Sequence, residues 1–282
     1  MPPPMVGIGQ SLGCGAITML ATWHPRLFSG IVLCEPALGP SPMATWPRPA
    51  KYYPGVLAAK RKDVWPSREE AGRALAKSVL YRHYDLRVLE RVLRYEIHEM
   101  DHDEQGEAMC PPGSVTLTTP KALVAAQWLR PSPRLLGFPT DPDDAVAQYM
   151  KITIPGFSRP EAWWFWRSLP QVYAPTLFVW GDQSELYSGA NTKFRAELYT
   201  NPLGTGPGGG GGHAAGQIAE VDVEGAHHSV VLEKPSGSAE AVGKWLEVKV
   251  QEWDEKSSQR NNQPINDPTK IPAALLERLA KL

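Results

Sequence analysis

Short apolar runs alternate with helix-like segments at both ends of the chain. Apolar runs predict four strands, at residues 5–9, 30–34, 175–180 and 218–223. Apolar residues at three- and four-residue spacing predict helices at 11–23, 191–199 and 239–250. Strands that alternate with helices favour an α/β fold class with a parallel sheet and helices on its faces.

A long insert separates the two α/β halves. Residues 40–169 contain helical periodicity, clearest over 67–100, and we expect them to form a helical lid over a core built from 1–39 and 170–253. The glycine-rich stretch 204–216 predicts a flexible loop, to which we assign no function. Residues 254–282 are expected to form a polar tail outside the core.

Composition and charge exclude several classes of protein. The 282 residues include 29 Lys and Arg against 30 Asp and Glu, a formal net charge of −1, which argues against a nucleic-acid partner. Cys14, Cys34 and Cys110 are too few and too scattered for a disulfide framework, so we expect reduced thiols inside a cell. The first residues lack a signal-peptide pattern, and no run approaches the ~18 apolar residues of a membrane span.

Residues 9–13, Gly-Gln-Ser-Leu-Gly, match the pattern G-x-S-x-G between a predicted strand and a predicted helix. In that setting a sharp turn presents Ser11 at the helix N-terminus, with Gly9 and Gly13 allowing neighbouring backbone to approach closely. The N–H of Leu12 would then stabilise an oxyanion. The alternative is that Ser11 is an ordinary helix N-cap.

Residues 7–38, with a His-Pro-Arg-Leu-Phe turn at 24–28, resemble the nucleophile elbow and following strand of α/β-hydrolases. The likeness is to a fungal group that includes peroxisomal hydrolases of toxin and secondary-metabolite clusters, and it extends to residues 63–69 and 116–121. It implies a partial α/β-hydrolase fold, a mostly parallel sheet lacking the N-terminal strands, with an inserted helical lid.

In that superfamily several strands precede the elbow, and a loop after the third supplies a second oxyanion N–H. Only ten residues precede Ser11 in this sequence. We therefore keep a second hypothesis open, a truncated and catalytically impaired homologue that acts as a binding protein.

The resemblance also implies that the catalytic histidine comes last in the chain. His213, His227 and His228 lie late enough, and His213 falls within the glycine-rich stretch. The family's histidine typically lies five residues before an acidic position and seven before a proline. Glu233 and Pro235 therefore select His228, with His227 as the alternative.

Two positions compete for the acid that orients the histidine. The commoner superfamily pattern, Gly-x-x-Asp, falls on residues 181–184, where this sequence has Ser184. The fungal group resembles an arrangement with the acid after the earlier strand, where Glu35 stands. We expect Glu35 to be the acid, with Glu185 and Asp182 as alternatives, or else to cap the first turn of the lid.

Residues 98–102 match H-E-x-x-H, the zinc-hydrolase pattern that places two imidazoles on one helix face. Without a further ligand motif downstream we expect His98 and His102 to lie on a charged helix end, and we predict no metal. Zinc hydrolysis through these two residues stays a third hypothesis. The aromatic run 163–166 is expected in the core, with an acyl-binding pocket as the alternative.

The last three residues, Ala280, Lys281 and Leu282, are a conservative variant of the Ser-Lys-Leu peroxisomal address. Together these patterns predict a serine hydrolase of an ester or acyl-CoA-like thioester, with catalytic Ser11, His228 and Glu35 and no cofactor. Its predicted partners are that small-molecule substrate and a peroxisomal import receptor; the alternative location is the cytoplasm.

Overall fold

The computed structural model describes residues 4–37, 54–100, 111–128, 130–131, 157–158, 160–184, 195–196, 198, 203–261 and 273–281. The main sheet is parallel throughout, with strand order β1-β2-β8-β9. Its strands are β1 (Val6–Gln10), β2 (Gly30–Cys34), β8 (Thr176–Gly181) and β9 (Ile218–Val223). All four predicted strands are confirmed, and so is the α/β class.

The register brings the carboxyl ends of these strands to one edge of the sheet. Gln10 of β1 pairs with Cys34 of β2, and Cys34 pairs in turn with Val179 of β8. Gly181, the last residue of β8, pairs with Val223, the last residue of β9. The loops that follow the four strands therefore meet at this edge, the usual place for a site in an open α/β sheet.

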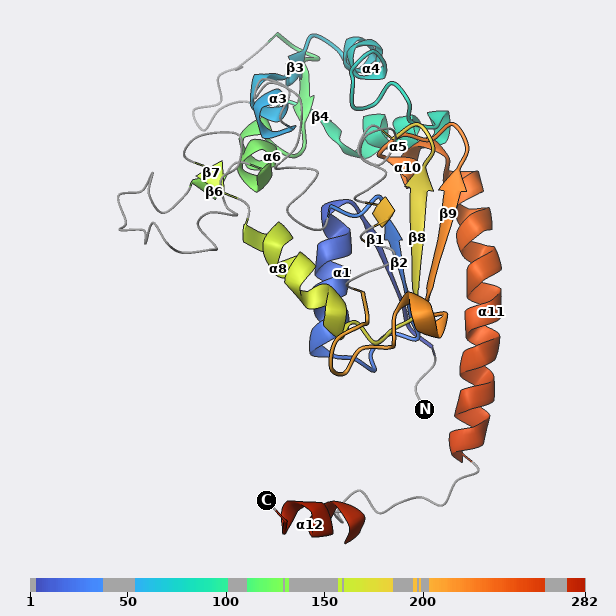
Figure 1. The fold of residues 1–282 in the computed structure, drawn as a ribbon. Coiled ribbons are helices and arrows are strands. Elements are labelled where there is room, and N and C mark those ends of the chain that lie inside the picture. The colour runs from blue at the N-terminus through green and yellow to red at the C-terminus, as the bar shows by residue number, and fades with distance from the viewer. Residues whose placement is uncertain are drawn as a thin grey trace.

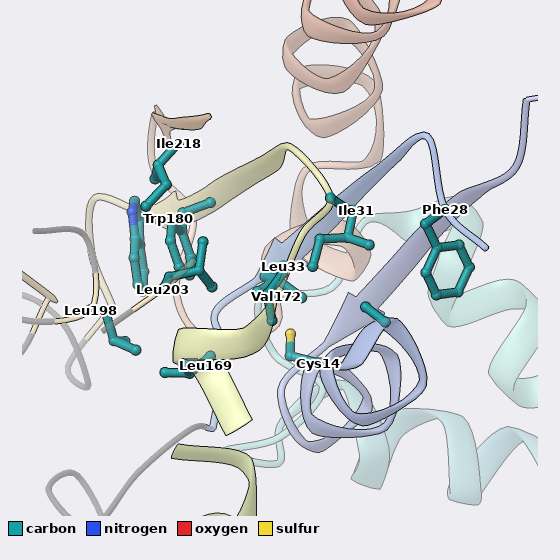
Figure 2. Close-up of a cluster of buried hydrophobic side chains, with 13 residues drawn as sticks. Cys14, Phe28, Ile31, Leu33, Leu169, Val172, Trp180, Leu198, Leu203 and Ile218 are labelled. Carbon is teal, nitrogen blue, oxygen red and sulfur yellow. The ribbon is translucent and has the colours of Figure 1, made fainter. Parts of the chain in front are cut away.

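Two apolar layers cover the sheet because alternate residues of a strand point to opposite faces. Ile31 and Leu33 of β2 belong to a cluster with α1 (Leu12–Trp23), against which Phe165 of α8 (Pro160–Ser168) also packs. In Figure 2, Cys14 on α1 is directed toward Leu33 and Val172 in this cluster.

On the opposite face, Val32 and Cys34 pack in a cluster with Val230, and Val242 and Trp245 of α11 (Pro235–Asn261) cover it. Figure 1 shows α1 and α8 on one side of the sheet and α11 on the other. Both faces of β2 and β8 are thus buried, which explains their unbroken apolar runs.

The aromatic run of α8 contributes to the first of these layers. Phe165 and Trp166 pack against the core, while Trp164 is half exposed. A Cβ on Gly15 of α1 would lie only 2.0 Å from the Phe165 ring, so the contact between α1 and α8 requires glycine at that position. The expected core role of the run is confirmed for Phe165 and Trp166.

The structure describes residues 54–100 and 111–128 of the predicted insert, and this part contains four helices and, beyond the prediction, a small sheet. It contains α3 (Pro54–Lys60), α4 (Arg68–Ala76), α5 (Leu86–Tyr95) and α6 (Lys121–Trp128). These surround an antiparallel sheet of order β3-β5-β4, formed by β3 (Val64–Trp65), β5 (Val115–Leu117) and β4 (Ile97–Glu99). The helix expected over 67–100 is interrupted between α4 and α5 and gives way to β4.

The insert lies at the end of the main sheet toward which the β8 and β9 arrows point in Figure 1. It has its own small core, in which Trp65, Tyr81 and Ile97 are buried. A separate two-stranded pair, β6 (Arg130–Pro131) and β7 (Phe157–Ser158), follows it in the chain. The insert therefore occupies the same edge as the loops after β1, β2, β8 and β9.

Other predicted boundaries also change. Helix α11 continues to Asn261, so the polar tail predicted from residue 254 begins later, and a short helix α12 (Ala273–Leu279) follows it. Most of the helix expected at 191–199 lies outside the described residues. None of the described helices is long and apolar enough to cross a membrane.

The glycine-rich stretch is held by backbone hydrogen bonds to the segment around η2 (Leu169–Gln171) and packs closely against it. The N–H of Gly204 donates to Leu169 O at 2.8 Å, and that of Gly210 donates to Val172 O at 3.1 Å. A Cβ at Gly209 would lie 2.4 Å from Gly204 O. Glycine is therefore required there for close backbone contact.

Candidate active site

Ser11 occupies the turn between β1 and α1 in a strained backbone conformation, with φ 53° and ψ −117°. Its N–H donates to Cys34 O at 2.9 Å, which ties the turn to the end of β2. A Cβ at Gly9 would lie 2.7 Å from Cys14 N, so a larger residue does not fit there. The same argument does not hold for Gly13, because a Cβ there would meet nothing within 4 Å.

His228 reaches Ser11 from the loop after β9. Its Nε2 lies 2.9 Å from Ser11 Oγ, although 217 positions separate the two residues. The side chain of Gln10 donates a hydrogen bond of 2.7 Å to the backbone carbonyl of His228. The residue before Ser11 therefore fixes the backbone that carries the imidazole.

Glu35 follows β2 and is fully buried. Its Oε2 lies 3.2 Å from His228 Nδ1 and accepts a 2.7 Å hydrogen bond from the Ser184 hydroxyl. Its Oε1 accepts from the N–H of Gly181 at 2.8 Å. A buried carboxylate needs such partners to offset lost hydration, and here all of them lie beside the imidazole. The alternative role for Glu35 is a cap on the first turn of the lid. The partners described here belong instead to β8, to the turn after it and to the histidine loop.

Backbone strain is concentrated in this group of side chains. Ser11 and Glu35, with φ 53° and 47°, are the two non-glycine residues with positive φ among those the structure describes. Such conformations cost roughly 1–3 kcal/mol each and persist where the surrounding structure imposes them, often at functional sites.

The N–H of Leu12 is suited to hold a developing oxyanion. Leu12 is the first residue of α1, so its N–H has no acceptor within the helix. The helix N-terminus also concentrates positive electrostatic potential beside Ser11. An N–H with the position expected of an oxyanion donor therefore lies next to the candidate nucleophile.

The two thiols next to the site are protonated at neutral pH. Burial, reinforced by the charge of Glu35, raises the pKa of Cys34 to about 12, and burial likewise raises the pKa of Cys14. The Cys14 thiol donates to Gly9 O at 3.1 Å, inside the elbow. Because the thiolate is the nucleophilic form, neither cysteine competes with Ser11. Cys110 lies outside the described residues.

The alternative base, His227, is directed away from Ser11. Its Nδ1 lies 3.0 Å from Glu233 Oε2, and its ring stacks on His83 of the insert with centroids 4.0 Å apart. The backbone N–H of His227 and of Ser229 also donate to Glu233. Glu233, used above only as a spacing marker, therefore holds the backbone on both sides of His228.

Of the alternative acids, Asp182 accepts a hydrogen bond from the N–H of Gly225 at 2.8 Å, and Glu185 lies outside the described residues. His213 begins the short helix η4 (His213–Ala215). The targeting residues Ala280 and Lys281 follow α12 and are exposed, while Leu282 is not described.

The zinc pattern does not have the helical geometry that it requires. His98 and Glu99 lie on strand β4, where His98 pairs with Thr116 of β5, and His102 is outside the described residues. The expectation of a helix end is therefore wrong for residues 98 and 99. Within the described part of the chain, no three His, Cys, Asp or Glu side chains are grouped closely enough to hold a metal ion.

Sequence reasoning missed the contacts that support the three central side chains. Ser184 departs from the usual Gly-x-x-Asp pattern, yet it donates to Glu35. Gln10 occupies a position that the G-x-S-x-G pattern leaves open, yet it donates to the carbonyl of His228. Neither residue type signals such a role without a structure.

A parallel sheet with a strained serine turn after one strand and a histidine loop after the last is the arrangement of the α/β-hydrolase fold. The solved structures agree. The peroxisomal α/β-hydrolase Lpx1 of Saccharomyces cerevisiae superimposes with a TM-score of 0.58 at 15% identity, over 99% of this chain and 61% of that one. E-2-(acetamidomethylene)succinate hydrolase gives a TM-score of 0.52 at 14% identity, over 87% of this chain and 68% of that one. The chain has the α/β-hydrolase fold.

Its sequence relatives are fungal proteins. The abhydrolase domain-containing protein AFT2-1 of Alternaria alternata is 34% identical over 132 residues, 47% of each chain. The type I acyl-CoA thioesterase mpaH of Penicillium roqueforti is 28% identical over 91% of this chain and 63% of its own length. The chain thus spans between about half and two thirds of the length of these relatives. No protein-family model matches it.

Proposed function

We propose that the chain is a serine hydrolase of esters or thioesters, in which Ser11 is the nucleophile, His228 the base and Glu35 the acid. The observation that carries this proposal is the continuous contact from Ser11 Oγ through both nitrogens of His228 to buried Glu35, with distances of 2.9 and 3.2 Å. A serine hydroxyl is a weak nucleophile until such a base accepts its proton.

In the proposed reaction, His228 Nε2 accepts the Ser11 proton as Oγ attacks the acyl carbonyl carbon. The Leu12 N–H donates to the oxyanion that forms, and Glu35 stabilises the positive charge on the imidazole. His228 then protonates the leaving alcohol or thiol, and the acyl group remains on Ser11. Water, deprotonated by His228, attacks the acyl-enzyme and releases the acid. No cofactor enters these steps.

We propose an acyl-CoA-like thioester of fungal secondary metabolism as the substrate class. The relative named as an acyl-CoA thioesterase, which is similar to most of this chain, supports a thioester. The position of the insert at the carboxyl ends of the strands supports its proposed role as a lid over the acyl group. The tripeptide at 280–282 and the peroxisomal structural neighbour support a peroxisomal location.

A fluorophosphonate probe, which reacts covalently with activated serines, tests the nucleophile. We expect wild-type protein to be labelled and the Ser11→Ala variant to lose labelling, with its kcat for a p-nitrophenyl ester lowered at least about 10³-fold. Ser29→Ala, at the opposite end of β2, serves as the matched control and should be labelled like wild type. Labelling that persists in Ser11→Ala would contradict the assignment.

The same preparation separates catalysis from binding alone. Hydrolysis of acetyl-CoA and of longer acyl-CoA thioesters, followed through the released thiol, should require Ser11. Folded wild-type protein that neither reacts with the probe nor hydrolyses any of these compounds would favour the impaired homologue that only binds its ligand.

A further inference from the structure

Ser184 stands where the commoner superfamily pattern has an aspartate, and its side chain is fully buried against Glu35. Its hydroxyl donates to Glu35 Oε2 at 2.7 Å, and this is the same oxygen that lies 3.2 Å from His228 Nδ1. The hydroxyl therefore acts on the carboxylate oxygen that contacts the base.

The donor to the other oxygen comes from the same short turn. Gly181 N–H donates to Glu35 Oε1, and Ser184 N–H donates to Gly181 O at 3.0 Å, which closes the turn 181–184. One donor alone would leave the Glu35 carboxylate free to rotate about its terminal torsion. Two donors on the same hydrogen-bonded turn fix the plane of the carboxylate.

The turn 181–184 is also attached to the histidine loop. Gln183 N–H donates to Ala226 O at 2.9 Å, and a Cβ at Gly181 would lie 2.4 Å from the carbonyl oxygens of both Ala226 and His227. The turn thus contacts the acid and the loop carrying the base at once. A displacement of this turn would change the distance between Glu35 and His228.

Two buried thiols lie within electrostatic range of Glu35. Burial, with the charge of Glu35 adding to it, raises the pKa of Cys34 to about 12 and also raises that of Cys14, so both thiols stay neutral at the pH of catalysis. A hydrogen bond from a hydroxyl to a carboxylate oxygen is short and directional. The 2.7 Å contact from Ser184 therefore favours one rotation of the Glu35 carboxylate, with Oε2 beside His228.

We propose that Ser184 is a positioning residue for the hydrolysis, which orients Glu35 toward His228 from the place where an aspartate would otherwise act. This inference rests on the proposed function. The Ser184 hydroxyl donates to the carboxylate oxygen beside His228, so we expect its effect on the base to pass through Glu35.

The test compares Ser184→Ala with Thr176→Val in the full chain. Thr176 is an equally buried hydroxyl on β8, but it donates to Ala174 O at the opposite end of the strand. We expect Ser184→Ala to lower kcat for p-nitrophenyl acetate about tenfold with KM changed less than about twofold, because the lost contact to a charged group acts on the transition state. Thr176→Val should keep wild-type kcat.

A second readout follows the acid and base directly. The proton on His228 Nδ1 gives a downfield proton NMR signal when it is held by Glu35, and we expect this signal to shift or broaden in Ser184→Ala and to stay unchanged in Thr176→Val. Should Ser184→Ala fail to fold by circular dichroism, Ser184→Cys replaces it, because a thiol fills the site but donates weakly. The same fall in kcat is expected for that variant.

Equal kcat in wild type and Ser184→Ala, with an unchanged downfield signal, would overturn the inference. So would an equal fall in Ser184→Ala and Thr176→Val, since that would indicate a general effect of removing a buried hydroxyl. A wild-type protein that is neither labelled by the fluorophosphonate nor active would instead refute the proposed function, before any variant is compared.

Discussion

At the scale of single residues, the site combines strained backbone with dense hydrogen bonding. Ser11 and Glu35 both have positive φ, and each is fixed by backbone contacts, from Ser11 N–H to Cys34 O and from Glu35 N–H to Val179 O. These contacts come from neighbouring strands of the sheet. The sheet therefore supplies the stabilisation that the two strained residues require.

Replacing Glu35 by glutamine tests the role of its charge. Glu35→Gln removes the negative charge and places an amide where Gly181 N–H and the Ser184 hydroxyl both donate, so the amide oxygen can replace only one of the two accepting oxygens. We expect kcat for a p-nitrophenyl ester to fall about 10³–10⁴-fold, since the imidazole loses its orienting anion.

Asp182→Asn is the matched control for that variant. Asp182 is a neighbouring carboxylate whose described contact is to Gly225 N–H, which an amide oxygen can replace. Its kcat should stay within about threefold of wild type. A comparable loss of kcat in both variants would show that Glu35 has no special role in orienting His228.

At the scale of secondary-structure elements, the insert and the histidine loop share a junction. Asp85 N–H donates to Leu232 O at 3.0 Å, and Arg87 donates to the Ser236 hydroxyl at 3.1 Å. His83 stacks on His227, the residue next to the candidate base. A movement of the residues before α5 would therefore be transmitted to the loop that carries His228.

This junction should weaken in acid. Partial burial and the nearby charges of His227 and Arg82 lower the pKa of His83, while Glu233 opposes them. Because the pKa of His83 is lower in the folded protein, the unfolded chain binds a proton at His83 at higher pH than the folded chain does. The contribution of His83 to the free energy of unfolding is therefore complete above about pH 6.5 and is lost as pH falls through the lower folded pKa. We expect the Tm of wild type to fall more between about pH 7.5 and about pH 5.5 than that of His83→Asn.

His24→Asn is the control for the junction, because His24 follows α1 and lies on no element of the insert. It should show the wild-type fall in Tm. An identical fall in wild type and His83→Asn would mean that the stacked histidines do not couple pH to stability. The effect is expected to be small, since His83 is largely exposed.

Strands and helices are predicted correctly where burial imposes a recognisable hydrophobic pattern on the sequence, and incorrectly where the elements are too short to carry one. Strands β2 and β8 are buried on both faces, so their sequences are continuous apolar runs. Strands β3 and β4 have two and three residues, too short for a period to show, and their pairing partner β5 lies far along the chain. The helical periodicity over 67–100 therefore predicts a helix at His98, where the structure has strand β4.

At the scale of the whole molecule, the parallel register explains why distant residues meet. Glu35 and His228 are 193 positions apart, yet both follow strands that end at one edge of the sheet. The family resemblance predicts both residues, whereas the G-x-S-x-G motif predicts only Ser11. The supporting donors Ser184 and Gln10 could not be named, because a hydroxyl or amide reveals its partner only when the register is known.

The tripeptide at residues 280–282 predicts a peroxisomal location for the protein. A peroxisomal import receptor would need access to the final tripeptide, and Ala280 and Lys281 are exposed after α12. A fluorescent protein fused before residue 1, with the fusion ending at Leu282, should colocalise with a peroxisomal marker in a fungal host. Deleting residues 280–282 should make the fluorescence diffuse, whereas Lys281→Arg, which keeps the cation, should preserve the punctate pattern. Punctate fluorescence that survives the deletion would show that another part of the molecule directs its location.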